Sequence, residues 1–356
     1  MGLPHRVITL YNHKGGVSKT TTTFNLAGFL ARTGKRVLMI DADPQCNLTQ
    51  IALASIIDER DRESVEKNEV VELPGTSVLD ALNQRIRGDV AFIDIEQIQL
   101  NEVDENLLLL RGSVDLSSIE DDLAEAHVQR MTQRTNLMRT YVAVGDFVTR
   151  LAEKYRCDYV FIDVGPSSGA LTRAFFLAAD HFFVPAAPDR FNVQAVSTLS
   201  RIVERWIAEH RQAVPSYAAV GLPVKHGAPS FLGLIVQAFK IYKGQPKPAF
   251  KLWQTRLPVE VKNKLRPVLR KREEGLYLPG GLKEVAVSIP DFGQLAPLMQ
   301  EVGKAVFALS QEDTARISES GKPWVGNNWT NAVERMESYR KCFEQLADIL
   351  NTVRKK

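Results

Sequence analysis

The residues with the strongest chemical signal lie in YNHKGGVSKTTTTFNLAG, residues 11–28, where two adjacent glycines precede a lysine and a run of threonines. Glycines allow backbone dihedrals that turn several N–H groups toward one point, and a helix N-terminus adds partial positive charge there. Lys19 can then neutralise phosphate oxygens, and the hydroxyl of Thr20 can bind Mg²⁺. The stretch therefore predicts a phosphate-binding loop between a strand and a helix.

This stretch departs from the simple GxxxxGK[ST] pattern at two positions. His13 stands at its first position and Ser18 at its sixth, where the pattern has glycine. A second lysine, Lys14, has no role in a simple phosphate loop. A surface turn with lysines placed by chance is the alternative explanation, and the strand, the helix and the acidic residues that follow argue against it.

Aspartates follow two of the expected strands at the point where each strand ends. Asp41 and Asp43 lie in IDADPQCNLT, and Asp163 lies in FIDVGPSSG. A single aspartate there is about as often a helix or turn cap. Because ligands of open α/β sheets bind outside the carboxyl ends of the strands, three carboxylates are expected to converge with Lys19 and Thr20. Such carboxylates hold Mg²⁺ through water or orient the attacking water in phosphoryl transfer.

Short apolar runs and helical patterns alternate along the chain. Several runs lack the polar alternation of a half-exposed strand, as expected of parallel strands covered on both faces. A helical pattern at residues 20–32 ends before Gly34, in the position of a C-terminal cap, and another covers residues 167–179. The alternation predicts an α/β fold, a doubly wound, mostly parallel sheet with helices on both faces. The five expected strands are residues 6–11, 36–41, 158–164, 181–188 and 230–239.

We expect one large domain, residues 1–356, with two insertions. The first, residues 51–135, is partly helical, and the second, residues 240–282, is basic. Apolar residues at helical spacing predict a C-terminal helix within residues 331–356 that packs on the sheet. Within the first insertion the expected elements are helices at 77–84 and 118–138 and a strand at 105–111.

The overall composition is that of an ordinary globular protein. Hydrophobic residues make up 44% and charged residues 24% of the 356 positions, and the formal net charge is +3. Because this charge is nearly balanced, any argument for nucleic acid depends on where the charges lie. The three cysteines lie far apart and form no CxxC pair, and the sequence has no secretory signal and no run of 18 apolar residues. These observations predict a cytoplasmic protein without a membrane segment.

The strings KGGVSKTTTTFNLAGFLARTGKRVLMIDADPQCNLT and DYVFIDVGPSSGALT resemble the ParA/MinD family of deviant Walker A (P-loop) ATPases. The string DADPQCNLT is closer to the ParA branch. The resemblance is strong over residues 6–50 and 155–205, weaker over 107–126, and faint at GLIVQ and at residues 285–306. It implies a P-loop NTPase fold of the deviant Walker A type, with ATP and Mg²⁺ as cofactors.

The resemblance also implies roles for the two lysines. Lys14 matches the extra lysine of the family, which reaches across a homodimer that sandwiches two ATP molecules and contacts the phosphates of the partner's ATP. It adds positive charge where negative charge gathers in the transition state. Lys19 and Thr20 match the residues that bind phosphate and Mg²⁺ within one subunit. The expected nucleotide-binding residues are Gly15, Gly16, Val17, Ser18, Lys19, Thr20 and Thr21.

The aspartates match the acidic motifs of the family. Asp43 is expected to orient the attacking water, which makes it a catalytic residue with Lys14 and Lys19. Asp41 supports the Mg²⁺ shell or the dimer contact, and Asp163 matches the Walker B aspartate that binds Mg²⁺ through water. The expected metal ligands are Thr20, Asp41 and Asp163.

The resemblance also implies a cellular function. Proteins of this family bind non-specific DNA and move plasmids, chromosomes or other cargo over the nucleoid, and a ParB-like or other partner protein stimulates their ATP hydrolysis. Between Lys240 and Arg272 eleven basic residues stand against a single acid, Glu260, and aromatic residues are interleaved. Such a cluster can neutralise several phosphates, and a solvated helix face is the alternative. The expected nucleic-acid-binding residues are Lys251, Lys262, Lys264, Arg266, Arg270, Lys271 and Arg272.

Three other functions compete with partition. Membrane binding, as in the MinD branch, is disfavoured because FEQLADILNTVRKK contains acids and lacks aromatic anchors near its end. A metabolic P-loop enzyme could use the two insertions as a substrate pocket, but neither contains a recognisable His/Asp or Cys/His constellation. An ATP-dependent regulatory subunit that acts on a partner effector suits the insertions nearly as well as partition.

Ser18 yields the first testable prediction. If this position needs a positive φ, serine costs on the order of 1 kcal/mol relative to glycine, so we expect nucleotide binding with slow hydrolysis. Ser18→Gly should raise ATP turnover, measured as phosphate release under saturating ATP. A wild type as fast as typical relatives, with no gain from glycine, would contradict the prediction.

Overall fold

The computed structural model describes residues 5–67, 71–88, 90–239, 241–242, 245–246, 248–272 and 275–353. Its centre is an eight-stranded sheet in the order β10-β7-β6-β1-β5-β2-β4-β3, in which β3 is antiparallel to its neighbour and the other pairs are parallel. The strands are β1 (Arg6–Leu10), β2 (Val37–Ala42), β3 (Asn101–Asp104), β4 (Leu107–Leu110), β5 (Tyr159–Val164), β6 (His181–Ala186), β7 (Ser230–Phe239) and β10 (Val285–Pro290).

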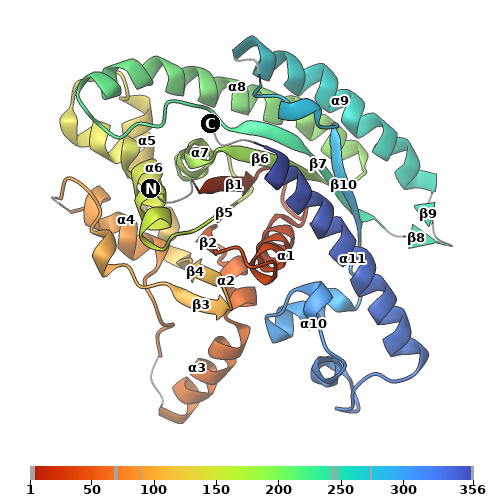
Figure 1. Ribbon diagram of the computed structural model, residues 1–356. Helices are drawn as coiled ribbons and strands as arrows, with labels where there is room; N and C mark the ends of the chain where they lie inside the picture. The colour runs from red at the N-terminus through yellow and green to blue at the C-terminus, as the bar shows by residue number, and fades with distance from the viewer. Residues whose placement is uncertain are drawn as a thin grey trace.

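Helices cover both faces of this sheet (Figure 1). One face packs against α1 (Lys19–Arg32), α2 (Asn47–Ala52), α10 (Leu295–Val302) and α11 (Asn327–Thr352). The other face packs against α4 (Val78–Ile86), α5 (Glu120–Val128), α6 (Thr135–Lys154), α7 (Ala170–Ala178), α8 (Arg190–Ala219) and α9 (Pro248–Arg272). α3 (Ala54–Lys67) has no fully buried residue and follows α2. The doubly wound α/β fold predicted from the sequence is confirmed.

The predicted strands form because their apolar runs are buried on both sides. Every residue of β2, β5 and β6 is buried, which explains the missing polar alternation. α1 ends as expected: Gly34 has φ +82° and donates its N–H to the carbonyl of Ala31. The C-terminal helix packs through Met336, Phe343, Leu346 and other residues against α1 and β10.

The helix expected at residues 118–138 is wrong in one respect. α5 ends at Val128, and α6 begins only at Thr135 and continues to Lys154. The intervening run QRMTQR has little apolar surface to bury, and Met131 within it is exposed. The chain therefore turns there, so that the two helices can pack separately against α7.

Residues 240–282, expected as an insertion, connect two neighbouring parallel strands, β7 and β10, through α9. α9 lies side by side with α8 (Figure 1). Its inner face is a stripe of buried apolar residues at four-residue spacing, which explains how a helix with many charges packs stably. The stripe consists of Leu257, Val261, Leu265 and Leu269. This basic segment is therefore one of the crossovers that build the sheet.

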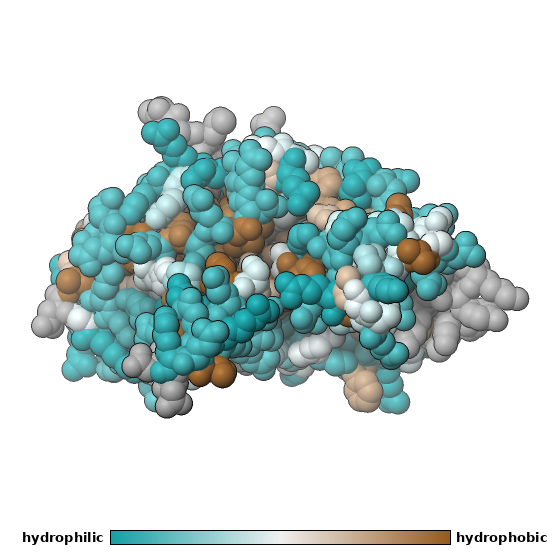
Figure 2. Space-filling view, turned by 90° about the horizontal axis from the view of Figure 1, so that it is seen from below, coloured by the Kyte–Doolittle hydropathy of each residue, from teal (hydrophilic) through white to brown (hydrophobic). Residues whose placement is uncertain are grey.

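One face of the molecule is mostly polar (Figure 2). Figure 2, seen from below the view of Figure 1, shows a face on which hydrophilic residues predominate and hydrophobic residues form small separate groups. Among the described residues, no helix is long and apolar enough to cross a membrane.

Candidate functional site

The loop between β1 and α1 lies at the carboxyl edge of the sheet and has two residues with positive φ. Gly16 has φ +69°, and a Cβ there would meet no atom within 4 Å, so glycine is required by the dihedral and not by space. Ser18 precedes α1 with φ 55° and ψ 35°, which is the left-handed conformation. This costs about 1–2 kcal/mol for a residue other than glycine. Ser18 therefore has the positive φ on which the prediction of slow hydrolysis depends.

A cavity of about 700 Å³ opens beside this loop. Its size is within the range of small-molecule and cofactor sites. All of the residues 15–21 line it, and residues of α2, of α10 and of the loops after β2 and β5 form its other walls. Its further lining residues are Asp43, Gln45, Asn47, Gln50, Ile51, Pro166, Pro297, Gln300 and Glu301. The lining residues of α2 and α10 were not among the predicted site residues.

Lys19 lies at the base of the cavity, with its side chain buried. Its exposed fraction is 7%, and its Nζ lies 3.4 Å from the carbonyl oxygen of Asn12. Burial lowers the pKa of Lys19, and the nearby carboxylates of Asp163 and Asp43 oppose this shift. A buried cation with few partners at a helix N-terminus is suited to bind an anion in the cavity.

Thr20 and Asp163 form a pair suited to a magnesium ion. The hydroxyl of Thr20 donates to Oδ2 of Asp163 at 2.7 Å. Asp163 is fully buried, and its Oδ1 has no hydrogen-bond partner in the described part of the chain. Burial, and then the charge of Asp41, raise the pKa of Asp163. A buried carboxylate oxygen without a partner, next to a hydroxyl, fits a hydrated Mg²⁺ that both groups would hold.

Asp41, in β2, and Asp43, directly after this strand, have different surroundings. Asp43 lines the cavity, and its Oδ1 accepts from the N–H of Gln45 at 3.0 Å. Asp41 is buried, and its Oδ2 accepts from the N–H and the hydroxyl of Thr49 at 2.8 and 2.6 Å. Burial raises the pKa of Asp41 to about 6. Asp41 thus anchors α2 to the sheet, and its contact with Mg²⁺ stays a prediction.

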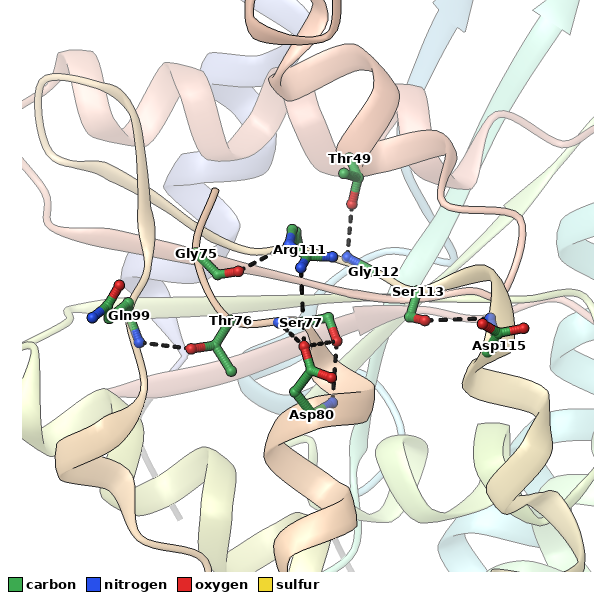
Figure 3. Close-up of polar contacts among 10 residues, drawn as sticks. All are labelled: Thr49, Gly75, Thr76, Ser77, Asp80, Gln99, Arg111, Gly112, Ser113 and Asp115. Atoms are coloured by element: carbon green, nitrogen blue, oxygen red, sulfur yellow. Dashed lines mark hydrogen bonds and ion pairs between the residues drawn. The ribbon is translucent and has the colours of Figure 1, made fainter. Parts of the chain in front are cut away.

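The hydroxyl of Thr49 links this anchor to the end of β4 (Figure 3). It accepts from the N–H of Gly112 at 2.8 Å, so it bridges the carboxylate of Asp41 and the backbone. The neighbouring Arg111 donates from Nε to the carbonyl of Gly75 at 2.9 Å and lies 3.9 Å from the carboxylate of Asp80. The first predicted insertion, which supplies β3 and β4, is therefore held together by these contacts beside the candidate site.

Lys14 points away from the cavity of its own subunit. Its Nζ lies 3.3 Å from Oδ2 of Asp189 and 5.2 Å from the ring centroid of Phe191. Asp189 caps α8 by accepting from the N–H of Asn192 at 2.7 Å. The lysine side chain is half-buried at the edge of the site, a position from which it can contact a second molecule. Its role across a dimer stays a prediction.

Sequence reasoning missed two amide side chains that hold the loop. Asn12 donates from Nδ2 to the carbonyl of Pro185 at 2.9 Å and accepts from the N–H of Lys14 at 3.1 Å. Gln237 donates from Nε2 to the carbonyl of Val17. Both residues lie at the carboxyl ends of strands. In the sequence, the only sign of their role was a polar amide residue at the end of an apolar strand.

The predicted nucleic-acid-binding residues lie on α9, away from the cavity. Most are exposed on its outer face: Lys251, Lys262, Lys264, Arg270 and Lys271. Arg266 is half-buried. The side chain of Arg272 lies outside the described residues, as do Lys240, Lys243 and Lys247.

The first strand of this parallel sheet leads through a glycine-containing loop into a helix that begins Lys-Thr, and aspartates lie at the ends of the neighbouring strands. These features define the class of P-loop nucleoside triphosphatases. Residues 5–215 match the family model AAA_31, described as an AAA domain, and the chain belongs to this family. The resemblance to the ParA/MinD ATPases is thereby confirmed.

Two relatives match more than half of the chain. The sporulation initiation inhibitor protein Soj of Bacillus subtilis is 31% identical over 205 residues, which cover 58% of this chain and 67% of Soj. The chromosome partitioning protein ParA of Caulobacter vibrioides is 30% identical over 203 residues, which cover 57% of this chain and 63% of ParA. The ATP complex of a McdA variant from Cyanothece has a TM-score of 0.57 at 17% identity, with 100% of both chains covered, and so shares the fold.

The anchor at Thr49 yields a stability prediction. Thr49→Val keeps the shape but leaves a buried carboxylate oxygen and a buried N–H without this hydroxyl, so we expect a loss of about 1–3 kcal/mol in the free energy of unfolding. Urea denaturation followed by circular dichroism measures it. Thr255→Val on the exposed face of α9 is the matched control and should change stability by less than about 0.5 kcal/mol. If the two substitutions lower the free energy of unfolding equally, Thr49 is not an anchor between Asp41 and the end of β4.

Proposed function

We propose that this protein binds and hydrolyses ATP and works as an ATP-dependent dimerising switch in DNA partition or cargo positioning. The observation that supports this best is the Thr20–Asp163 pair: Thr20 lines a nucleotide-sized cavity, and the carboxylate of Asp163, bonded to Thr20, has one oxygen without a hydrogen-bond partner among the described residues. The names of the relatives, a chromosome partitioning protein among them, and the ATP complex of the McdA variant support the same function.

The phosphate loop binds the triphosphate through its N–H groups, the N-terminus of α1 and the ammonium group of Lys19. Thr20 and Asp163 would hold Mg²⁺, Asp163 through water. The chemistry that a bound ion would supply there is neutralisation of phosphate charge. Because Lys19 is buried next to carboxylates, its position is fixed before the nucleotide enters, so binding requires little reordering of the side chain.

Asp43 orients the water that attacks the γ-phosphate. The N–H of Gln45 holds one of its oxygens, and Asp43 faces the cavity. A Cβ at Gly165 would lie 3.1 Å from this carboxylate, so glycine there lets the loop after β5 approach Asp43. In this proposal one carboxylate, that of Asp163, would hold the metal, and another, that of Asp43, would orient the attacking water.

The second subunit completes the site. Lys14 exchanges its contact with Asp189 for the phosphates of the partner's ATP. Since this contact joins half-exposed charges in solvent, it contributes little to stability and opens easily. Two copies related by a twofold axis would each donate one lysine.

Dimerisation is tested by size-exclusion chromatography. The wild type should elute as a dimer with a non-hydrolysable ATP analogue and Mg²⁺ and as a monomer with ADP, while Lys14→Ala should stay monomeric with both. Lys35→Ala, at an exposed lysine after α1, is the control and should behave as the wild type. The proposed switch fails if the wild type never dimerises with the analogue.

The outer face of α9 is the proposed surface for non-specific DNA. Its exposed lysines and arginines are distributed along a helix of 25 residues, with the apolar stripe turned inward. A basic helix surface of this kind can neutralise phosphates of the DNA backbone without reading bases. A ParB-like or other activating protein is the proposed second partner, which stimulates hydrolysis.

Salt dependence tests the DNA surface. Replacing Lys262, Lys264 and Lys271 together with glutamine should weaken ATP-dependent binding to random-sequence DNA. The slope of log K against log salt should fall by about 0.9 for each phosphate that the variant no longer neutralises. The control replaces three exposed lysines on other elements, Lys35, Lys322 and Lys341. If both triple variants weaken binding equally, net charge is responsible and α9 is not the surface.

A further inference from the structure

Gln237 joins the phosphate loop to a strand that lies two positions away in the sheet. It stands near the carboxyl end of β7, and β6 separates β7 from β1. The side chain is only 3% exposed. Its Oε1 accepts from the hydroxyl of Thr22 at 2.8 Å, and its Nε2 donates to the carbonyl oxygen of Val17. One buried amide therefore holds both the loop and the first turn of α1.

The contact with Val17 fixes the orientation of one peptide plane in the loop. The carbonyl of Val17 and the N–H of Ser18 belong to the same trans peptide, and the two groups point in opposite directions. When Gln237 holds the oxygen, the N–H of Ser18 is turned away from Gln237. Ser18 lines the cavity, so the orientation of this N–H decides whether the loop presents it to a phosphate.

Ser18 is also the residue of the loop that most needs support from outside. Its φ of 55° is unfavourable for a residue with a Cβ, and its side chain makes no capping hydrogen bond. Without the amide, the peptide between Val17 and Ser18 could rotate toward a relaxed conformation, which would remove one N–H from the phosphate site. In a loop with glycine at this position the same restraint would matter less.

We infer that Gln237 is a positioning residue, which keeps the phosphate loop in its binding conformation against the strain at Ser18. This inference rests on the proposed function, because it assigns Gln237 a part in binding the triphosphate. Gln237 touches no phosphate itself and acts through Val17 and Thr22.

The experiment measures the affinity for a fluorescent ATP analogue with Mg²⁺ in a double-mutant cycle. Gln237→Leu keeps most of the volume and removes both hydrogen bonds, and we expect binding about tenfold weaker. Ser18→Gly alone gives the effect of glycine in the presence of Gln237 and completes the cycle. Added to Gln237→Leu, it should restore most of the affinity, because glycine holds the conformation without help.

Two further variants separate positioning from general stability. Gln237→Glu keeps the acceptor for Thr22 and removes the donor to Val17, so it should also weaken binding, and Ser18→Gly should rescue it. Gln311→Leu removes a comparable amide-to-carbonyl bond, to Trp324, from a segment that does not line the cavity, and should leave the affinity unchanged. Urea unfolding without nucleotide checks that each variant is folded.

The outcomes separate this inference from the function on which it rests. A wild type that does not bind the analogue overturns the proposed function together with the role of Gln237. A wild type that binds, with Gln237→Leu and Gln237→Glu binding equally well, overturns the role of Gln237 alone. The role of Gln237 is also overturned if the effects of Gln237→Leu and Ser18→Gly on affinity are independent of each other. If Gln237 only stabilised β7, glycine in the loop would not restore the affinity that Gln237→Leu loses.

Discussion

A sheet that is buried on both faces can place functional polar groups only at the ends of its strands, and the whole candidate site depends on this constraint. The register of the parallel strands sets Asp41 directly beside Asp163, and Leu10, the last residue before the loop, beside Asp163 on its other side. Neighbouring backbones therefore bring the carboxylates and the phosphate loop together. The helices on each face keep water away from the strands, and α1, α2 and α10 also line the cavity.

The same constraint makes the site electrostatically demanding. Asp163 and Asp41 are buried beside each other, with Lys19 as the buried cation at the base of the cavity. Burial and mutual repulsion raise the pKa of Asp163, which disfavours its charged form. A divalent cation reverses this preference, because its charge stabilises neighbouring carboxylates. The arrangement is therefore better suited to a metal nucleotide than to a neutral ligand.

The sequence predicted the parts of the molecule that depend on local pattern. Continuous apolar runs identified the inner strands, and Lys19, Thr20, Asp43 and Asp163 stood at strand or helix ends that such runs define. Gln237 could not be predicted, because its contact depends on how two distant strands align across β6. The cavity walls from α2 and α10 and the break between α5 and α6 depend likewise on tertiary packing.

The place of α9 between β7 and β10 separates two kinds of change that this protein can tolerate. Its inner stripe is fixed, because those residues pack against α8 and hold a crossover of the sheet together. Its outer face makes no such contribution, and the residues there can be exchanged with little effect on folding. A chain built in this way can acquire a new partner or lose an old one by surface substitutions alone, while its nucleotide chemistry stays the same.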